Sequence, residues 1–68
     1  MNVSPEDIVI TDKETNEALL TIEGWSDETK PIDTFRKYIL ADCSKFVELD
    51  TSTMFAWKKS SSTWVQMQ

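Results

Sequence analysis

Few side chains in this sequence could carry catalytic chemistry. The 68 residues include one cysteine, Cys43, and no histidine, so the common Ser-His-Asp and Cys-His nucleophiles are excluded. A zinc site would lack its usual nitrogen and sulfur ligands. A single glycine, Gly24, excludes a phosphate-cradling loop and a dinucleotide-binding fingerprint. We therefore predict a protein that is not an enzyme and that needs no metal or cofactor.

The aromatic residues are a more informative group. Trp25 lies in a polar connector, residues 24–31, where it would either plug one end of a small core or act as an exposed interface anchor. Trp57 and Trp64 lie in the last third of the chain. A row of rings there favours core or interface packing, with a platform for stacking sugar rings as the alternative.

The last third of the chain has the clearest strand pattern. Residues 43–49, 54–58 and 63–67 are rich in β-formers, and the segments between them have turn compositions. We predict a three-stranded antiparallel meander whose turns close on Thr51-Ser52 and on Ser60-Ser61. In that register one face carries two rows: Phe46, Trp57 and Trp64, then Glu48, Phe55 and Gln66. The opposite face also carries two rows: Val47, Ala56 and Val65, then Leu49, Met54 and Met67.

A sheet with one solvent-exposed face should alternate apolar and polar residues, but this meander has apolar residues on both faces. Both faces would therefore need to be covered. We expect the N-terminal hairpin to cover one face and a second copy or a partner to cover part of the other. The predicted core aromatic residues are Phe46, Phe55, Trp57 and Trp64. The predicted interface residues are Trp25, Leu49, Met54 and Met67.

The first half of the chain is less regular. Residues 8–10 and 18–22 predict a hairpin with a loop over 11–17, and a helix over 12–22 is the alternative. Residues 33–40 predict a short helix or irregular segment, with a strand over 38–40 as the alternative. Residues 1–7 predict a flexible or partner-ordered arm. The prediction is a single domain, residues 1–68, that is mainly β, with a small α+β fold as the alternative.

Size and charge point to association. A chain this short buries only about 60% of the surface of its unfolded form, and one cysteine provides no internal disulfide. Residues 1–34 carry nine acids and two bases (−7), whereas residues 35–68 carry three acids and five bases (+2). This asymmetry is consistent with a solvated acidic surface or with charge-complementary docking between copies. Five bases in one half do not favour nucleic-acid binding. The apolar runs are too short to span a membrane, and no secretory signal opens the chain.

The connector and the meander together resemble a pattern in small virion structural proteins of tailed bacteriophages. The similar segments are Gly24-Trp25-Ser26-Asp27-Glu28-Thr29-Lys30-Pro31, then Ser44-Lys45-Phe46-Val47-Glu48-Leu49-Asp50-Thr51, then Phe55-Ala56-Trp57 and Trp64. Ser52 stands where the pattern has a turn glycine, which argues against a tight two-residue turn. The resemblance implies a non-enzymatic component of a phage head, neck or tail.

We therefore expect a virion structural or accessory protein, made in the host cytoplasm, that packs into a repeated assembly. Its partners would be copies of itself, a larger virion protein, or both. The alternatives are a surface-carbohydrate binding module that uses exposed tryptophans and an acidic intracellular inhibitor of a host protein.

Overall fold

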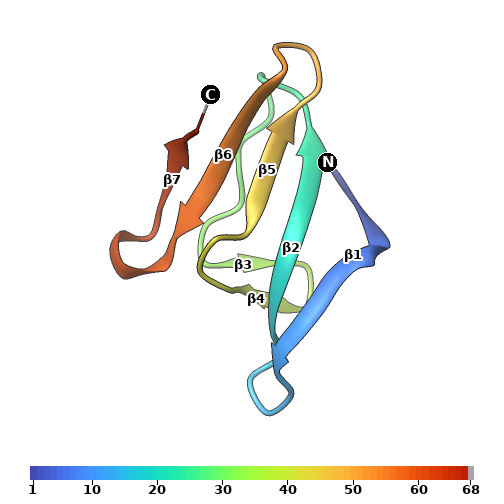
Figure 1. The fold of residues 1–68 in the computed structure, drawn as a ribbon, viewed down its shortest axis with the longest axis vertical. Helices are drawn as coiled ribbons and strands as arrows, with labels where there is room; N and C mark the ends of the chain where they lie inside the picture. Colours follow the sequence, from blue (N-terminus) through green and yellow to red (C-terminus); the bar gives the residue numbers. More distant parts are fainter. Residues whose placement is uncertain (68) are drawn as a thin grey trace.

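The computed structural model, described over residues 1–67, is a mixed seven-stranded sheet (Figure 1). The strands are β1 (Asn2–Asp12), β2 (Glu17–Gly24), β3 (Thr34–Phe35), β4 (Tyr38–Leu40), β5 (Lys45–Glu48), β6 (Thr53–Lys58) and β7 (Thr63–Gln66). A short 3₁₀ turn, η1 (Lys59–Ser61), joins β6 to β7. The prediction of a mainly β fold with an N-terminal strand pair and a C-terminal meander is confirmed.

Five strands lie side by side in the order β1, β2, β5, β6 and β7 (Figure 1). β2 runs antiparallel to β1 and parallel to β5, and the meander strands alternate in direction. The small β3–β4 hairpin joins the same sheet, because β4 pairs in parallel with the first residues of β2. The N-terminal hairpin therefore extends the meander sideways, so our expectation that it covers one face of the meander is wrong.

The N-terminal segment is held by the sheet. Residues 2–7, for which we expect an arm, belong to β1, where Asn2 pairs with Glu23 and Val3 with Ile22. The β1–β2 register shifts between Val3 and Ile8, at a β-bulge or similar irregularity. Val3 is buried in the core, and this apolar anchor explains why the segment is ordered within the chain itself.

The prediction of a short helix or irregular segment over residues 33–40 is wrong, whereas its alternative, a strand over 38–40, is confirmed. The segment is the β3–β4 hairpin, in which Phe35 pairs with Tyr38. Left-handed backbone angles at Asp33 (φ 61°) and Arg36 (φ 56°) are incompatible with a helix here. The buried Phe35 and Leu40 side chains, together with the pairing of β4 to β2, outweigh the helical spacing of the apolar residues.

One register of the meander was predicted correctly and the other was not. Trp57 pairs with Trp64, as predicted for β6 and β7. Phe46, however, pairs with Phe55 and not with Trp57, so the predicted β5–β6 register is wrong by two residues. The cause is a four-residue loop with Ser52 in the left-handed region (φ 57°), where we expected a two-residue turn. A shift of two preserves side-chain alternation, so each residue still lies on the predicted face.

The core lies between the sheet and the connector that follows β2. Its buried side chains include Leu20, Ile22, Phe46 and Trp57. The connector, residues 25–33, crosses behind β5 and β6 in Figure 1 and continues into β3. The connector therefore forms an incomplete second layer over the aromatic face, and the β3–β4 hairpin adds Phe35 and Leu40 to the core.

A candidate interaction surface on the open face of the sheet

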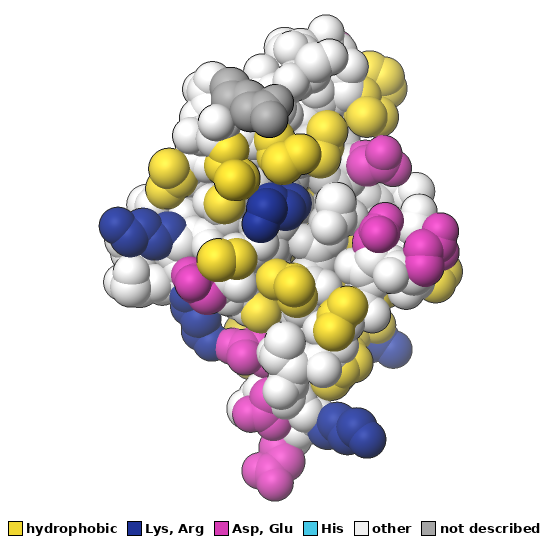
Figure 2. Space-filling view, in the orientation of Figure 1, with side chains coloured by type: hydrophobic (Ala, Val, Ile, Leu, Met, Phe, Trp, Pro, Cys, Tyr) yellow, Lys and Arg dark blue, Asp and Glu magenta, His cyan; other side chains and the backbone are white. Residues whose placement is uncertain are grey.

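The face of the sheet away from the connector has no second layer in the described chain. We call it the open face and define it as the odd-numbered residues of β2, β5 and β7 and the even-numbered residues of β6. These residues alternate with the buried Leu20, Ile22, Phe46 and Trp57, which point to the core. Figure 2 shows hydrophobic side chains gathered across this face, with a basic side chain among them.

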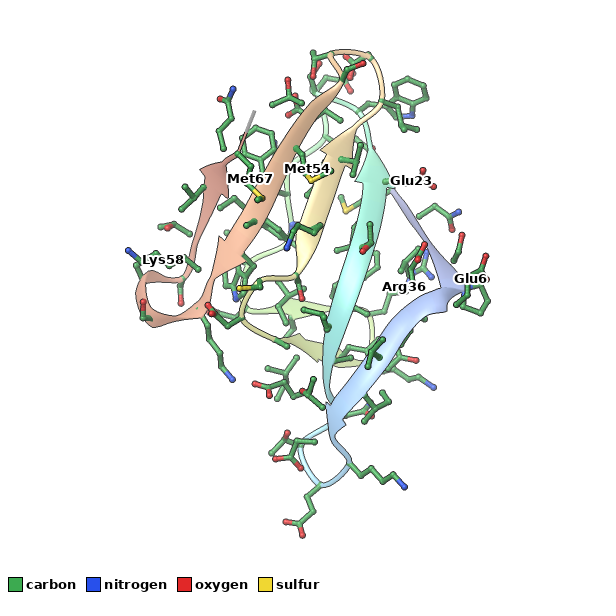
Figure 3. All side chains as sticks on the ribbon, in the orientation of Figure 1. Glu6, Glu23, Arg36, Met54, Lys58 and Met67 are labelled. Carbon is green, nitrogen blue, oxygen red and sulfur yellow. The ribbon has the colours of Figure 1, made fainter. Side chains whose placement is uncertain are left out.

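The four predicted interface residues lie on this face or at its end. Met54 pairs with Val47, and the Met67 amide donates to the Met54 carbonyl oxygen over 2.8 Å, so both methionines occupy one row (Figure 3). Trp25 and Leu49 follow β2 and β5 directly, and the Leu49 amide donates to the Gly24 carbonyl oxygen over 2.8 Å. Trp25 is 50% exposed, Leu49 47% and Met67 53%, whereas Met54 is half-buried.

The four predicted core aromatic residues lie on the opposite side of the sheet. Phe46 and Trp57 are buried, and Phe55 and Trp64 are partly buried against them. The Trp64 ring packs 5.1 Å from Trp57 and 5.9 Å from Phe46 between centroids. Its indole N–H donates to the Pro31 carbonyl oxygen over 2.8 Å, which ties the connector to β7. These rings therefore form packing contacts, and only Trp25 among the tryptophans is well exposed.

A polar clamp holds the connector against the aromatic face. The Lys30 ammonium lies 4.2 Å from the Phe55 ring centroid and 5.1 Å from that of Phe46. It also donates to the Glu48 carboxylate over 2.7 Å. The Lys30 ammonium and then the Thr51 hydroxyl, which both donate to Glu48, lower the pKa of its carboxyl below the usual value.

Similar contacts fix the two ends of the sheet. The Ser26 hydroxyl and amide both donate to Asp50 and lower the pKa of that carboxyl. At the other end, the Lys59 ammonium and the Thr11 hydroxyl donate to Glu17 and lower its pKa. The ends of the open face are thus set by loops that are anchored to neighbouring strands.

Most charges of the open face lie at the ends of its strands, and Lys45 is nearest its apolar centre. Lys45 lies next to Val47 along β5 on this face, and its ammonium bends back to donate to the Cys43 carbonyl oxygen over 2.7 Å. Glu23, at the end of β2, pairs with Val47 in the strand register (Figure 3). The face is therefore apolar around Val47, Met54 and Val65, with the half-buried Lys45 within it and Glu17, Glu23 and Lys58 at its margins.

No pocket is found in residues 1–67, and no group of three or more Cys, Asp or Glu side chains there is placed to hold a metal ion. The Cys43 thiol is exposed and donates to the adjacent Asp42 carboxylate over 3.5 Å. No described helix is long and apolar enough to cross a membrane.

Sequence reasoning missed part of the open face. Val65 is 47% exposed beside the predicted interface residues, and Leu19 and Val9 extend the apolar surface onto β2 and β1. Strand alternation placed Val65 on the correct face, so this residue could have been included. Leu19 and Val9 could not, because nothing local in the sequence shows that β2 pairs in parallel with β5.

Comparisons of the chain with protein-family models, with curated proteins and with solved structures find no match.

Proposed function

We propose that this chain is a non-enzymatic assembly component that docks against a neighbouring protein through the open face of its sheet. The observation that carries the proposal is the row of Val47, Met54 and Met67, with Val65 beside it, left uncovered on a sheet whose other face is packed. Exposed apolar patches of this kind usually mark interaction sites, since they gain free energy when they leave water.

The charges of the face indicate the chemistry of its occupant. A second copy centred on this face would bring two Lys45 ammonium groups close together, and like charges within an apolar contact are unfavourable. A different protein with an apolar surface and a carboxylate facing Lys45 would pair that charge. The occupant that fits best is therefore another component of the assembly.

The resemblance to small tailed-phage virion proteins suggests that the assembly is a phage particle, put together in the host cytoplasm. A carbohydrate-binding role receives less support, because Trp57 is 1% exposed and Trp64 is half-buried beneath the connector. Trp25 alone would be left as a stacking ring.

Charge placed on the open face tests the proposal. Met54→Asp should abolish co-purification with the neighbouring virion protein, whereas Ile32→Asp should not, because Ile32 is 56% exposed on the connector, away from this face. Both variants should keep the parent's circular dichroism spectrum. The proposal is wrong if Met54→Asp binds as well as the parent, or if the parent is absent from purified particles. A parent found outside particles and bound to a host enzyme would favour the inhibitor alternative.

A further inference from the structure

Apart from the two-residue β3, which pairs with β4 alone, the sheet has two outer strands whose far edges meet no other strand in the described chain. They are β1 on one side and β7 on the other. Natural edge strands are usually protected from pairing by charged residues, proline or bulges. β1 contains Pro5, two adjacent acids and a bulge, whereas β7 (Thr63–Gln66) contains neither a charged residue nor a proline. β7 therefore resembles a strand that receives a partner.

The backbone of β7 shows which groups face outward. The Met67 amide donates a hydrogen bond to the Met54 carbonyl oxygen of β6. In an antiparallel ladder every second residue bonds to the same neighbouring strand, so the backbone groups of Val65 also point to β6. The N–H and C=O groups of Trp64 consequently point to the outer edge of the sheet.

The backbone of β1 is arranged in a corresponding way. The carbonyl oxygen of Ala18 and the amide of Leu20 bond on the side of β2 that faces β4 and β5. Leu19 must therefore direct its backbone groups to β1, where its partner is Val9. Ile10, next to Val9, thus presents its N–H and C=O groups to the outer edge.

The two edges fit each other in direction and side-chain placement. β1 and β7 run in opposite directions, so β7 of one copy placed beside β1 of the next forms an antiparallel pair. In that pair Trp64 can bond to Ile10 while Val65 and Val9 meet on the open face. Val9 is 55% exposed and Ile10 40% exposed, so the contact would also bury apolar surface.

Charge favours unlike edges over like edges. Glu6 and Asp7 lie on β1, and Lys58 lies at the end of β6 beside β7. Figure 3 shows Glu6 and Lys58 on opposite sides of the molecule. None of these three residues takes part in the three ion pairs found within residues 1–67. Pairing β1 with another β1 would bring acids together. In the β1–β7 register above, Thr63 faces Thr11, so Lys58, which pairs with Thr63, lies towards Asp12 of the next copy and away from Glu6 and Asp7.

We propose that copies of this chain associate head to tail, with β7 of one copy extending the sheet at β1 of the next. Such a heterologous contact generates a closed ring when its rotation closes and a filament when it does not. The inference uses the two edges and is independent of what docks on the open face. In the assembly, the open faces of successive copies would form one continuous apolar band.

Cysteine cross-linking tests the contact directly. In a Cys43→Ser background, the variants Val9→Cys and Val65→Cys are mixed and treated with a short bismaleimide. The expected product is a dimer containing one copy of each variant, with little product from either variant alone. A protein carrying both cysteines should give a ladder of multimers. Self-cross-linking of Val9→Cys or Val65→Cys as the main product would contradict the proposal, since it indicates pairing of like edges.

A proline on the outer edge provides the second test. Ile10→Pro removes an N–H group that points away from β2, so the β1–β2 ladder keeps its hydrogen bonds. The matched control Ile10→Thr keeps the N–H group and the β-branched shape. Sedimentation velocity from micromolar to millimolar concentration should show multimers of the parent and of Ile10→Thr, weakened at least about tenfold in Ile10→Pro.

The outcomes separate this inference from the proposed function. Met54→Asp, on the open face, should leave the multimers intact. The inference is overturned if the parent stays monomeric throughout, or if Ile10→Pro folds and assembles like the parent. Multimers lost in Met54→Asp but kept in Ile10→Pro would show that copies meet through the open face. If Ile10→Pro does not fold, the cross-linking result decides.

Discussion

The two neighbouring tryptophans illustrate how burial decides the contribution of a single side chain. Trp57 is 1% exposed, whereas Trp64 is partly exposed and shares its surface with the connector. Trp57→Ala should therefore cost about 3–5 kcal/mol of unfolding free energy, a large part of what so small a domain has. Trp64→Ala should cost less, because part of the Trp64 ring is already exposed in the folded state. Urea unfolding of both variants checks the order.

Trp57→Phe is the informative control for this comparison. The Trp57 indole N–H is buried and has no hydrogen-bond partner among the described residues, so replacing the ring with phenylalanine loses no hydrogen bond identified there. We expect Trp57→Phe to be clearly more stable than Trp57→Ala. A Trp64→Ala variant less stable than Trp57→Ala would show that the connector contact outweighs core burial.

Glu48 sets the expected response to pH. Hydrogen bonds from Lys30 and Thr51 lower the pKa of Glu48, so the native state favours the ionised carboxyl. That stabilisation is fully present above the ordinary glutamate pKa of about 4.3, and it is lost as the pH falls through the lower pKa of the folded state. Urea midpoints should therefore change little between about pH 6 and 8 and fall in acid.

The variant Glu48→Gln isolates this contribution. It should be less stable than the parent at neutral pH, and the difference should shrink as the pH is lowered. Glu6→Gln is the control, because Glu6 is exposed and forms none of the ion pairs found in residues 1–67. A Glu48→Gln difference that stays constant down to strongly acidic pH would show that Glu48 contributes through shape and not through charge.

The end of β2 requires a glycine because other groups approach it closely. A Cβ atom built on Gly24 would lie 2.6 Å from the Phe46 ring and 2.7 Å from the Glu28 carboxylate. Since Phe46 is buried and has little room to move, Gly24→Ala should destabilise the fold by roughly 1–3 kcal/mol. Thermal unfolding measures this, with Glu23→Ala as the neighbouring exposed control. A Gly24→Ala variant as stable as that control would mean that the Phe46 ring can shift.

Sequence reasoning recovered those parts of the fold that alternation and turn composition encode. The three C-terminal strands and the faces of their side chains were predicted because Phe46, Trp57 and Trp64 alternate with outward-facing residues. The β5–β6 register was missed because Ser52 adopts a left-handed conformation that sequence composition favours only weakly for serine. The four predicted interface residues fell on or beside one face for the same reason, namely strand alternation.

The elements that sequence reasoning missed depend on contacts between distant segments. Nothing near β2 in the chain indicates that it pairs in parallel with both β4 and β5. Because β4 pairs with β2, residues 33–40 form a hairpin although the spacing of their apolar residues is helical. The connector then covers the aromatic face. Val9 and Leu19 joined the candidate surface only through this placement.

At the scale of the whole molecule, the two halves of the sequence, which differ in net charge, lie on opposite sides of the sheet. The acid-rich first half provides β1 and β2 on one side of the sheet, and the second half provides β5, β6 and β7 on the other. Glu6 and Lys58 mark the two sides in Figure 3. A head-to-tail contact places the acid-rich side of one copy beside the base-bearing side of the next, and this is the orientation that the edge strands also favour.

Salt should therefore separate the two contributions to association. Charges on opposite edges steer copies together, and their reach falls from about 10 Å at 0.1 M salt to about 3 Å at 1 M. Backbone pairing of β7 with β1 and the burial of Val9 and Ile10 depend little on ionic strength and strengthen in sulfate. We expect multimers to persist in 1 M NaCl but to form more slowly, as measured by sedimentation and by stopped-flow light scattering. Multimers that dissolve at high salt, with Ile10→Pro no weaker than Ile10→Thr, would show that surface charge alone holds the copies together.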